Sequence, residues 1–367
     1  MVAVSTTYST STYYKAAAAV TAATTSSTTA TTVASTTGQS ATSVTLSDEA
    51  KAALATKDFV TVLSETRAKL LTLLKEAART SPLEGEKLAV DLSSLDSREL
   101  FAMGKDDTFT PDEQKAAGIE MQRRFESAMA GPAGLAKVTG NFTALYKAAA
   151  EFLDALGPEE KADADWIAGR AAVTDAQKQL ATDPETFPDA GEDDPVALYL
   201  ALVEAGEQIK PQPIADVATT ARKTLDALYA DAIKTGKAPT FNKSTSVGTY
   251  IDMSKFDSRT LSSIVLDSTG KFTVEEASAA KTAMRGKSGA ALVAGFQSAA
   301  KSSDPTAFSQ NIMSLFGGMS TEERQAAGWS ESFYQAAVDS YNSTSKLTQM
   351  FAEAGGDSTG FMSWMGK

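Results

Sequence analysis

An internal duplication limits the possible folds of this chain more than any other feature of its sequence. Residues 109–166 align without gaps to residues 272–329 at an offset of 163, with 14 identities in 58 positions. Trp166 falls on Trp329, and the chain has only three tryptophans. Helical composition alone would give scattered alanine matches, not rare residues at one fixed offset. A unit of roughly 150 residues is a whole domain rather than a short repeat, so we expect two homologous domains in tandem.

Two short motifs recur in the same register. Asp-Ser-Arg-x-Leu at 96–100 returns at 257–261, and Phe-Thr-x-x-Glu at 109–113 returns at 272–276. Asp before a short helix and Thr-x-x-Glu at a helix start are capping patterns, in which side chains bind the free backbone N–H groups of the first turn. We therefore expect both motifs to start helices, with the arginine of the first motif free for an ion pair.

Other repeated residues have structural interpretations too. Arg67 matches Arg222 at an offset of 155. The acidic pairs at 159–160 and 322–323 each follow a helix start, where the helix dipole favours negative charge. We expect the two matched tryptophans to anchor cores, the alternative being that they line a ligand pocket.

Apolar residues recur at three- and four-residue spacing almost everywhere beyond residue 46, which predicts a mainly α fold. Only 88–92 and 250–253 resemble short strands. The expected helices are 48–56, 58–79, 96–103, 111–130, 142–156, 158–181, 195–208, 213–235, 257–266, 274–286, 289–302, 305–317, 320–328 and 330–354.

Composition along the chain predicts the domain boundaries. Prolines, glycines and acidic residues cluster before residue 195 and indicate a linker. The expected parts are a disordered Ser/Thr-rich arm at 1–46, helical copy 1 at 47–182, an acidic Pro/Gly linker at 183–194, helical copy 2 at 195–355 and a Gly-rich apolar tail at 356–367.

The chain has neither cysteine nor histidine. This excludes a thiolate nucleophile, a Ser-His-Asp triad and zinc sites built from cysteine or histidine. Since no Walker loop, Rossmann fingerprint or nucleophile elbow is present either, we expect a non-enzymatic protein. The enzyme alternative would need an Asp/Glu or Tyr/Lys site in a groove between the two domains.

Residues 257–286 resemble a degenerate EF-hand, a calcium-binding helix-loop-helix. Asp267, Thr269, Thr273 and Glu276 take the positions that the resemblance makes calcium ligands, but Val265 stands where the first aspartate belongs. Calcium needs six to eight oxygen ligands, so the site is incomplete and the capping interpretation is preferred. We expect no cofactor, with calcium as the alternative.

The charge of the chain constrains its partners. Its 34 basic and 46 acidic residues give a net charge of -12, and an acidic surface repels the phosphate backbone. No stretch approaches the roughly 20 apolar residues of a membrane span. We expect protein partners or self-association, no nucleic acid, and a chain that is not integral to a membrane.

The N-terminal arm suggests export. Ser and Thr make up 23 of residues 1–45, and Lys15 is the only charged side chain there. The sequence Ser-Val-Thr-Leu-Ser-Asp-Glu-Ala at 43–50 resembles segments of bacterial flagella-associated proteins. That resemblance implies an exported structural or interaction protein of a bacterial surface assembly, reaching the exterior by a Sec-independent route. A cytoplasmic protein is the alternative.

The C-terminal tail combines glycines with large apolar residues. Phe361, Met362, Trp364 and Met365 lie within its last seven residues. Trp and Met are favoured at interfaces, so these side chains are candidates for contact with a partner, or for packing back onto the second domain.

Overall fold

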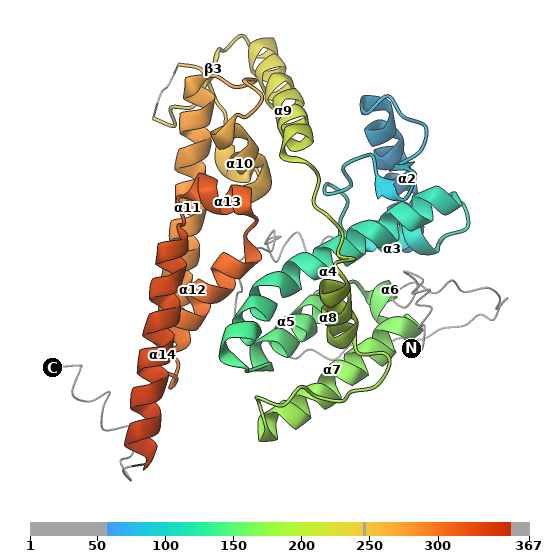
Figure 1. Cartoon of the computed structure of the whole chain (residues 1–367). Coiled ribbons are helices and arrows are strands. Elements are labelled where there is room, and N and C mark those ends of the chain that lie inside the picture. Colours follow the sequence, from blue (N-terminus) through green and yellow to red (C-terminus); the bar gives the residue numbers. More distant parts are fainter. Residues whose placement is uncertain (1–56, 245–246, 354–367) are drawn as a thin grey trace. The chain divides into compact units, whose positions relative to one another are not determined.

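The fold is mainly α-helical, as the sequence predicted. A computed structural model describes residues 57–244 and 247–353, and Figure 1 shows how helices dominate this part of the chain. The expected arm at 1–46, the expected helix at 48–56 and the tail at 356–367 with its four candidate interaction residues lie outside the described residues. Contacts divide the described residues into unit 1, comprising 57–129 and 140–209, and unit 2, comprising 130–139, 210–244 and 247–353.

Unit 1 is built around the short helix α3. In chain order its elements are α2 (Phe59–Glu76), β1 (Leu83–Glu84), β2 (Lys87–Leu88), α3 (Ser97–Lys105), most of α4 (Pro111–Thr139), α5 (Thr143–Asp154), α6 (Pro158–Lys161), α7 (Ala164–Thr182) and α8 (Pro195–Ala205). The strands β1 and β2 form a two-stranded antiparallel pair.

Unit 2 follows a similar order of elements. They are α9 (Ile214–Lys234), β3 (Pro239–Thr240), β4 (Thr249–Tyr250), a 3₁₀ turn (Met253–Lys255), α10 (Ser258–Leu266), α11 (Val274–Ala299), α12 (Ala307–Gly318), α13 (Thr321–Ala327) and α14 (Glu331–Glu353). Here the two short strands pair in parallel. The strands expected at 88–92 and 250–253 are shorter than predicted and begin earlier. They correspond to the two-residue strands β2 and β4, which start at residues 87 and 249.

Each unit buries its own apolar core. In unit 1, Leu70 of α2, Leu100 and Met103 of α3 and Met121 of α4 belong to one buried cluster. Within this cluster Leu70 and Leu74 lie four positions apart on α2, and Leu100 and Met103 lie three apart on α3, which is the spacing that puts apolar side chains on one helix face.

The corresponding cluster in unit 2 joins α9, α10 and α11. Leu225, Leu261, Ile264 and Met284 are buried in it. Leu100 and Leu261, which end the repeated Asp-Ser-Arg-x-Leu motif, are both fully buried. The repeated motif thus places equivalent side chains in the core of each unit.

Helix α4 is longer than the sequence indicated. The prediction ended it at residue 130, before Gly131 and Pro132, yet it continues to Thr139. A Cβ on Gly131 would collide with the carbonyl oxygen of Ser314, so glycine permits a close approach of this helix to α12 within unit 2. Tertiary packing therefore outweighs the helix-breaking tendency of the sequence here.

The region expected to be a linker packs against unit 1. Asp194 is buried, and the hydroxyl of Tyr146 donates a hydrogen bond of 2.5 Å to its carboxylate. Val196 and Tyr199 of α8 are also buried, and α8 contacts α5 and α7. The second unit therefore begins at Lys210 instead of residue 195, because α8 completes the first core.

One expected helix and one expected pair of helices differ as well. The predicted helix 158–181 is split into α6 and α7 at residues 162–163, while 274–286 and 289–302 form the single helix α11. Among the described residues, none of the helices combines the length and apolar character needed to cross a bilayer.

Candidate functional site

The loop between α10 and α11 is the expected calcium loop. Backbone N–H groups of the loop already bind the carboxylate of Asp267, its first acidic residue. Asp267 has a positive φ of 37° and ends α10. Its carboxylate accepts hydrogen bonds from the backbone N–H of Lys271 at 2.8 Å and of Phe272 at 3.4 Å. The carboxylate thus closes a turn within the loop, while Thr269 is exposed.

Glu276, the other expected calcium ligand, points toward α9. Its Oε1 accepts hydrogen bonds from Arg222 Nη1 at 2.7 Å and from the Tyr229 hydroxyl at 2.6 Å. Its Oε2 accepts the backbone N–H of Thr273 at 2.7 Å. Both carboxylate oxygens are therefore engaged inside unit 2.

The electrostatics of Glu276 fit this structural role. Burial alone would raise its pKa, but the hydrogen bonds from Tyr229 and Thr273, together with Arg222, outweigh burial and lower the pKa. The Thr273 hydroxyl accepts the backbone N–H of Glu276 at 3.2 Å, which completes the expected capping box. The capping interpretation of this motif is confirmed.

Unit 1 contains the same arrangement. Arg67 of α2 donates to Glu113 at 3.1 Å, and Glu113 accepts the backbone N–H of Thr110 at 2.7 Å. The guanidinium of Arg67 lies 3.9 Å from the centre of the Phe109 ring. The equivalent distance from Arg222 to the Phe272 ring is 5.6 Å. In each unit an arginine on the first helix lies over the motif phenylalanine, closely in unit 1 and more loosely in unit 2, and holds the capping glutamate.

The sequence paired these residues between the copies but did not show that they contact each other. Arg67 and Glu113 are 46 positions apart in the chain, and Arg222 and Glu276 are 54 apart. In the sequence, the one indication of these contacts was that the arginine and the glutamate of each pair were both among the residues matched between the two copies. We name this contact of arginine, phenylalanine and glutamate the Arg–Glu clamp.

The repeated Asp-Ser-Arg motif also behaves as predicted in unit 1. Asp96 caps α3, and Arg98 Nε donates to Glu159 at 2.7 Å, with a second bond between the same two side chains. The hydrogen bond from Arg98 lowers the pKa of Glu159. The expected ion pair is therefore a two-bond pair joining α3 to α6.

In unit 2 the equivalent ion pair is looser. Asp257 caps α10, but Arg259 approaches Glu322 only to 3.9 Å. Arg259 instead donates to the Ser320 hydroxyl at 3.3 Å and to the Gln212 carbonyl at 2.5 Å. The arginine still ties α10 to its neighbours, now through neutral acceptors.

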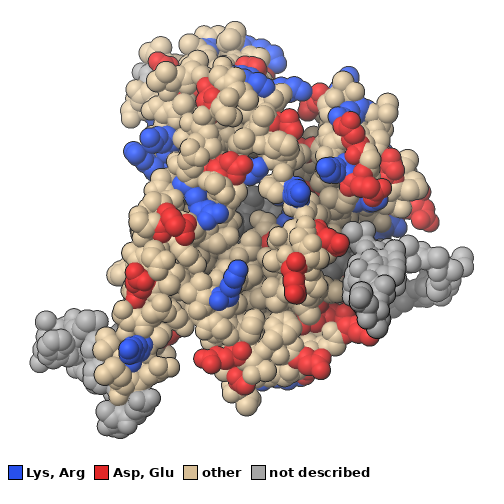
Figure 2. Space-filling view, viewed as in Figure 1, with Lys and Arg blue, Asp and Glu red and all other residues tan. Residues whose placement is uncertain are grey.

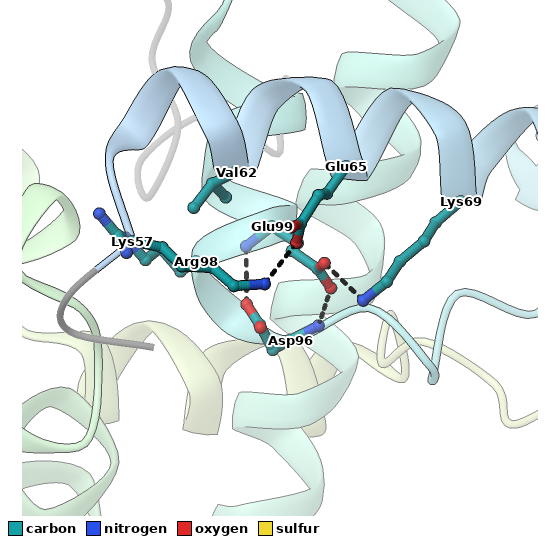
Figure 3. Close-up of a pocket in the computed structure, with 7 residues that line it drawn as sticks. All are labelled: Lys57, Val62, Glu65, Lys69, Asp96, Arg98 and Glu99. Carbon is teal, nitrogen blue, oxygen red and sulfur yellow. Dashed lines mark hydrogen bonds and ion pairs between the residues drawn. The ribbon is translucent and has the colours of Figure 1, made fainter. Parts of the chain in front are cut away.

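A small polar pocket lies between α2 and α3 (Figure 3). It has a volume of about 120 Å³, which is well below the roughly 300 Å³ at which ligand pockets begin. Lys57 donates to Glu65 at 2.6 Å and Lys69 donates to Glu99 at 2.5 Å. These four charges are paired: Lys69 with Glu99 between α2 and α3, and Lys57 with Glu65 within the first turns of the α2 segment. The residues that line the pocket are Lys57, Val62, Glu65, Lys69, Asp96, Arg98 and Glu99.

Glu160 is a buried acid that the sequence did not single out from its neighbour. Its side chain is almost completely covered, and burial raises its pKa to about 7. One oxygen accepts the backbone N–H of Gly157 at 2.5 Å, while Oε1 has no hydrogen-bond partner. Glu160 does not line the pocket of Figure 3, so its raised pKa has consequences for stability rather than for a bound ligand.

The matched tryptophans are half-buried and occupy different surroundings. The Trp166 indole N–H donates to the Leu153 carbonyl at 2.9 Å. Trp329 packs edge-on against Phe333, with ring centres 5.1 Å apart. Both belong to helix contacts at the rim of their unit rather than to the fully buried core.

Within residues 57–244 and 247–353, no group of three or more acidic side chains lies in a position to hold a metal ion. Searches with the whole sequence and structure found no matching family model, no matching curated protein and no matching solved structure.

Proposed function

We propose that this protein is a non-enzymatic structural or interaction protein that is exported to a bacterial surface assembly, with flagella as the favoured setting. The observation that carries the structural, non-enzymatic part of this proposal is the Arg–Glu clamp. In both units an arginine and a glutamate, side chains suited to chemistry, are used to join helices, and in unit 2 both carboxylate oxygens of the glutamate accept hydrogen bonds from protein groups. Such a network favours a rigid helical framework over a reactive site.

The Arg–Glu clamp also supports common ancestry of the two units. Capping boxes are frequent because they depend on four neighbouring residues. A distant arginine that reaches the capping glutamate and lies over the preceding phenylalanine is a more demanding combination, and it occurs in both units. We infer that the two units descend from one duplicated domain that supplied two similar surfaces.

The distribution of surface charge supports a protein partner. On the face shown in Figure 2, basic and acidic side chains are interspersed and no broad basic field is visible. With a net charge of -12, such a surface lacks the electrostatic attraction that drives binding to nucleic acid.

Export rests on the N-terminal sequence. The Ser/Thr-rich arm and the flagella-like segment at 43–50 are the features that support a Sec-independent route. In the source bacterium, the full-length protein should be recovered from the cell surface or medium, and electron microscopy of that fraction should show it attached to filaments or surface structures. A variant lacking residues 2–46 should remain inside the cell.

Two controls make this experiment decisive. A cytoplasmic marker followed in the same fractions excludes release by lysis. A variant with Gly289→Ala, an exposed helix position where a Cβ meets no atom within 4 Å, controls for the effect of altering the chain at all. Recovery of the intact full-length protein in the cytoplasm alone would contradict the proposal.

A further inference from the structure

The end of unit 2 formed by α11, α12 and α14 exposes large apolar side chains. Val293, Phe296, Leu347 and Met350 are 55%, 60%, 47% and 57% exposed, and Phe308 is 37% exposed. We name these five residues the distal patch. Isolated exposed apolar residues are common, but a group of this kind at one end of a helix bundle indicates a surface that is normally covered.

Contacts place the distal patch at one end of the three helices. The Phe296 and Phe308 rings meet edge to face at 5.7 Å, which joins the end of α11 to the start of α12. The Ser309 hydroxyl lies 3.1 Å from that of Ser340, so the start of α12 also adjoins the middle of α14, and Leu347 and Met350 follow seven and ten residues further along that helix. Helix α12 contacts both α11 and α14, and in Figure 1 α14 continues past α12 to the end near which the chain leaves the described region.

Unit 1 shows what covers the equivalent helices. There α8 packs on α5 and α7, and its Val196 and Tyr199 are buried. On α7 the burial extends to Leu180, two residues before the helix ends. On α14, among side chains 331–350, only Ala337 is buried. Unit 1 thus has a covering helix after α7, while the described part of unit 2 ends with α14.

We propose that the C-terminal segment 360–367 covers the distal patch. Phe361 follows Glu353, the last residue of α14, by eight positions, and eight residues span at most about 29 Å. Met350 lies one helical turn before that end. The segment therefore reaches the distal patch and supplies four large apolar side chains, as α8 supplies Val196 and Tyr199 in unit 1.

The tether selects this segment over a second molecule. A short connection holds a segment near its site at an effective concentration of the order of millimolar. A second copy of the chain at micromolar concentration competes poorly against that. The chemistry of the segment also fits, because its only charged side chain is Lys367 and the distal patch is apolar.

The absence of cysteine from the natural chain provides a clean test. In the full-length protein, Met350→Cys combined with Met362→Cys should form an intramolecular disulfide under mild oxidation. The matched control combines Gln349→Cys with Met362→Cys. Gln349 is exposed and nearly as close to the tail along the chain, but lies about 100° around the helix from Met350.

If the segment docks on the distal patch, the Met350 pair should close about tenfold faster than the Gln349 pair. Adding Phe361→Ser and Trp364→Ser should remove that difference while leaving helical content unchanged. Equal closure rates before those substitutions would overturn the proposal, because an undocked tail samples both positions alike. Disulfide-linked dimers through Met350 would also overturn it and assign the distal patch to a second copy.

Discussion

At the scale of single residues, Glu160 and Glu323 occupy matching positions but have different surroundings. Glu323 takes part in a capping box with Ser320, whose hydroxyl receives its backbone N–H at 3.2 Å. Gly157 stands at the place of Ser320 in unit 1 and offers only a backbone N–H. Glu160 is buried with one oxygen unpaired, and this raises its pKa to about 7.

The raised pKa of Glu160 predicts a pH-dependent loss of stability. Between its ordinary pKa of 4.5 and about 7, the folded state keeps a proton that the unfolded state has released. The stabilising contribution of Glu160 to the free energy of unfolding is therefore fully present below pH 4.5. It falls by about 3 kcal/mol at most as the pH rises to about 7. Glu160→Gln should be more stable than the natural protein at pH 8, with the advantage shrinking toward pH 5. Urea denaturation across that range measures the difference.

The neighbouring Glu159 provides a control of opposite sign. Its pKa is lowered by the hydrogen bond from Arg98, so its stabilising contribution exists above its ordinary pKa and is lost as pH falls. Glu159→Gln should therefore destabilise the protein at pH 8. An identical pH profile for Glu160→Gln and the natural protein would show that Glu160 is not held protonated by burial.

At the scale of helices, the Arg–Glu clamp fixes the start of α4 in unit 1 and of α11 in unit 2. Each capping glutamate ties its own helix start to a helix more than 40 residues earlier in the chain. The carboxylate that an EF-hand would give to calcium is the one that Arg222 holds in unit 2.

Removal of the capping carboxylate should be costly. Glu276→Ala leaves Arg222, the Tyr229 hydroxyl and the Thr273 N–H without their partner, and should lower the free energy of unfolding by about 3 kcal/mol. Glu275→Ala alters an exposed acid at the adjacent position and should cost less than about 1 kcal/mol. Chemical denaturation of the two variants measures both losses in the free energy of unfolding. Equal losses would contradict the prediction.

Calcium titration is a separate test of the same carboxylate. Since both oxygens of Glu276 are engaged by protein groups, we expect no heat of binding at millimolar calcium in calorimetry. A binding isotherm that Glu276→Gln abolishes would instead support the calcium alternative.

The packing of α4 on α12 depends on glycine. The Cα of Gly131 lies 3.4 Å from a Cβ built on Gly317, and a Cβ on Gly131 would collide with Ser314. Gly131→Ala should therefore destabilise unit 2 by about 1–3 kcal/mol. Gly289→Ala in α11 meets no neighbouring atom and should be neutral or stabilise by up to about 1 kcal/mol. Thermal unfolding of both variants compares the two sites, and a neutral Gly131→Ala would contradict the close approach.

At the scale of the whole molecule, two cores with equivalent residues share one chain. Leu100 and Leu261 are fully buried, one in each core, and follow the same motif. Each unit has its own set of buried residues, although α4 contributes to both. Local stability should therefore respond separately to changes in each core.

Matched truncations test this separation. Leu100→Ala should lower the free energy of unfolding by about 2–5 kcal/mol and speed amide hydrogen exchange mainly in α2 and α3. Leu261→Ala should cause a similar loss and speed exchange mainly in α9 and α10. Mass spectrometry of the exchanged peptides resolves the two sets. Acceleration of both sets by either substitution would show that the two cores unfold together.

The features predictable from sequence are local. The mainly α fold follows from apolar spacing, and the helix starts at residues 97, 111, 258, 274 and 321 follow from side chains that cap their own first turn. These signals act within a few residues, so a single sequence suffices to find them. The capping role of Thr273 with Glu276, preferred over calcium ligation, came from the same reasoning.

Tertiary structure decided everything that depends on distant segments. The sequence matched Arg67 to Arg222 and Glu113 to Glu276, but only the fold showed that each arginine holds its glutamate. Likewise Gly131 and Pro132 predicted that a helix would end at residue 130, yet α4 continues to Thr139. The expected linker at 183–194 does separate two helices, but the following helix α8 completes the core of unit 1. The sequence determined local conformation because its causes lie a few bonds away, whereas burial depends on which remote surfaces meet.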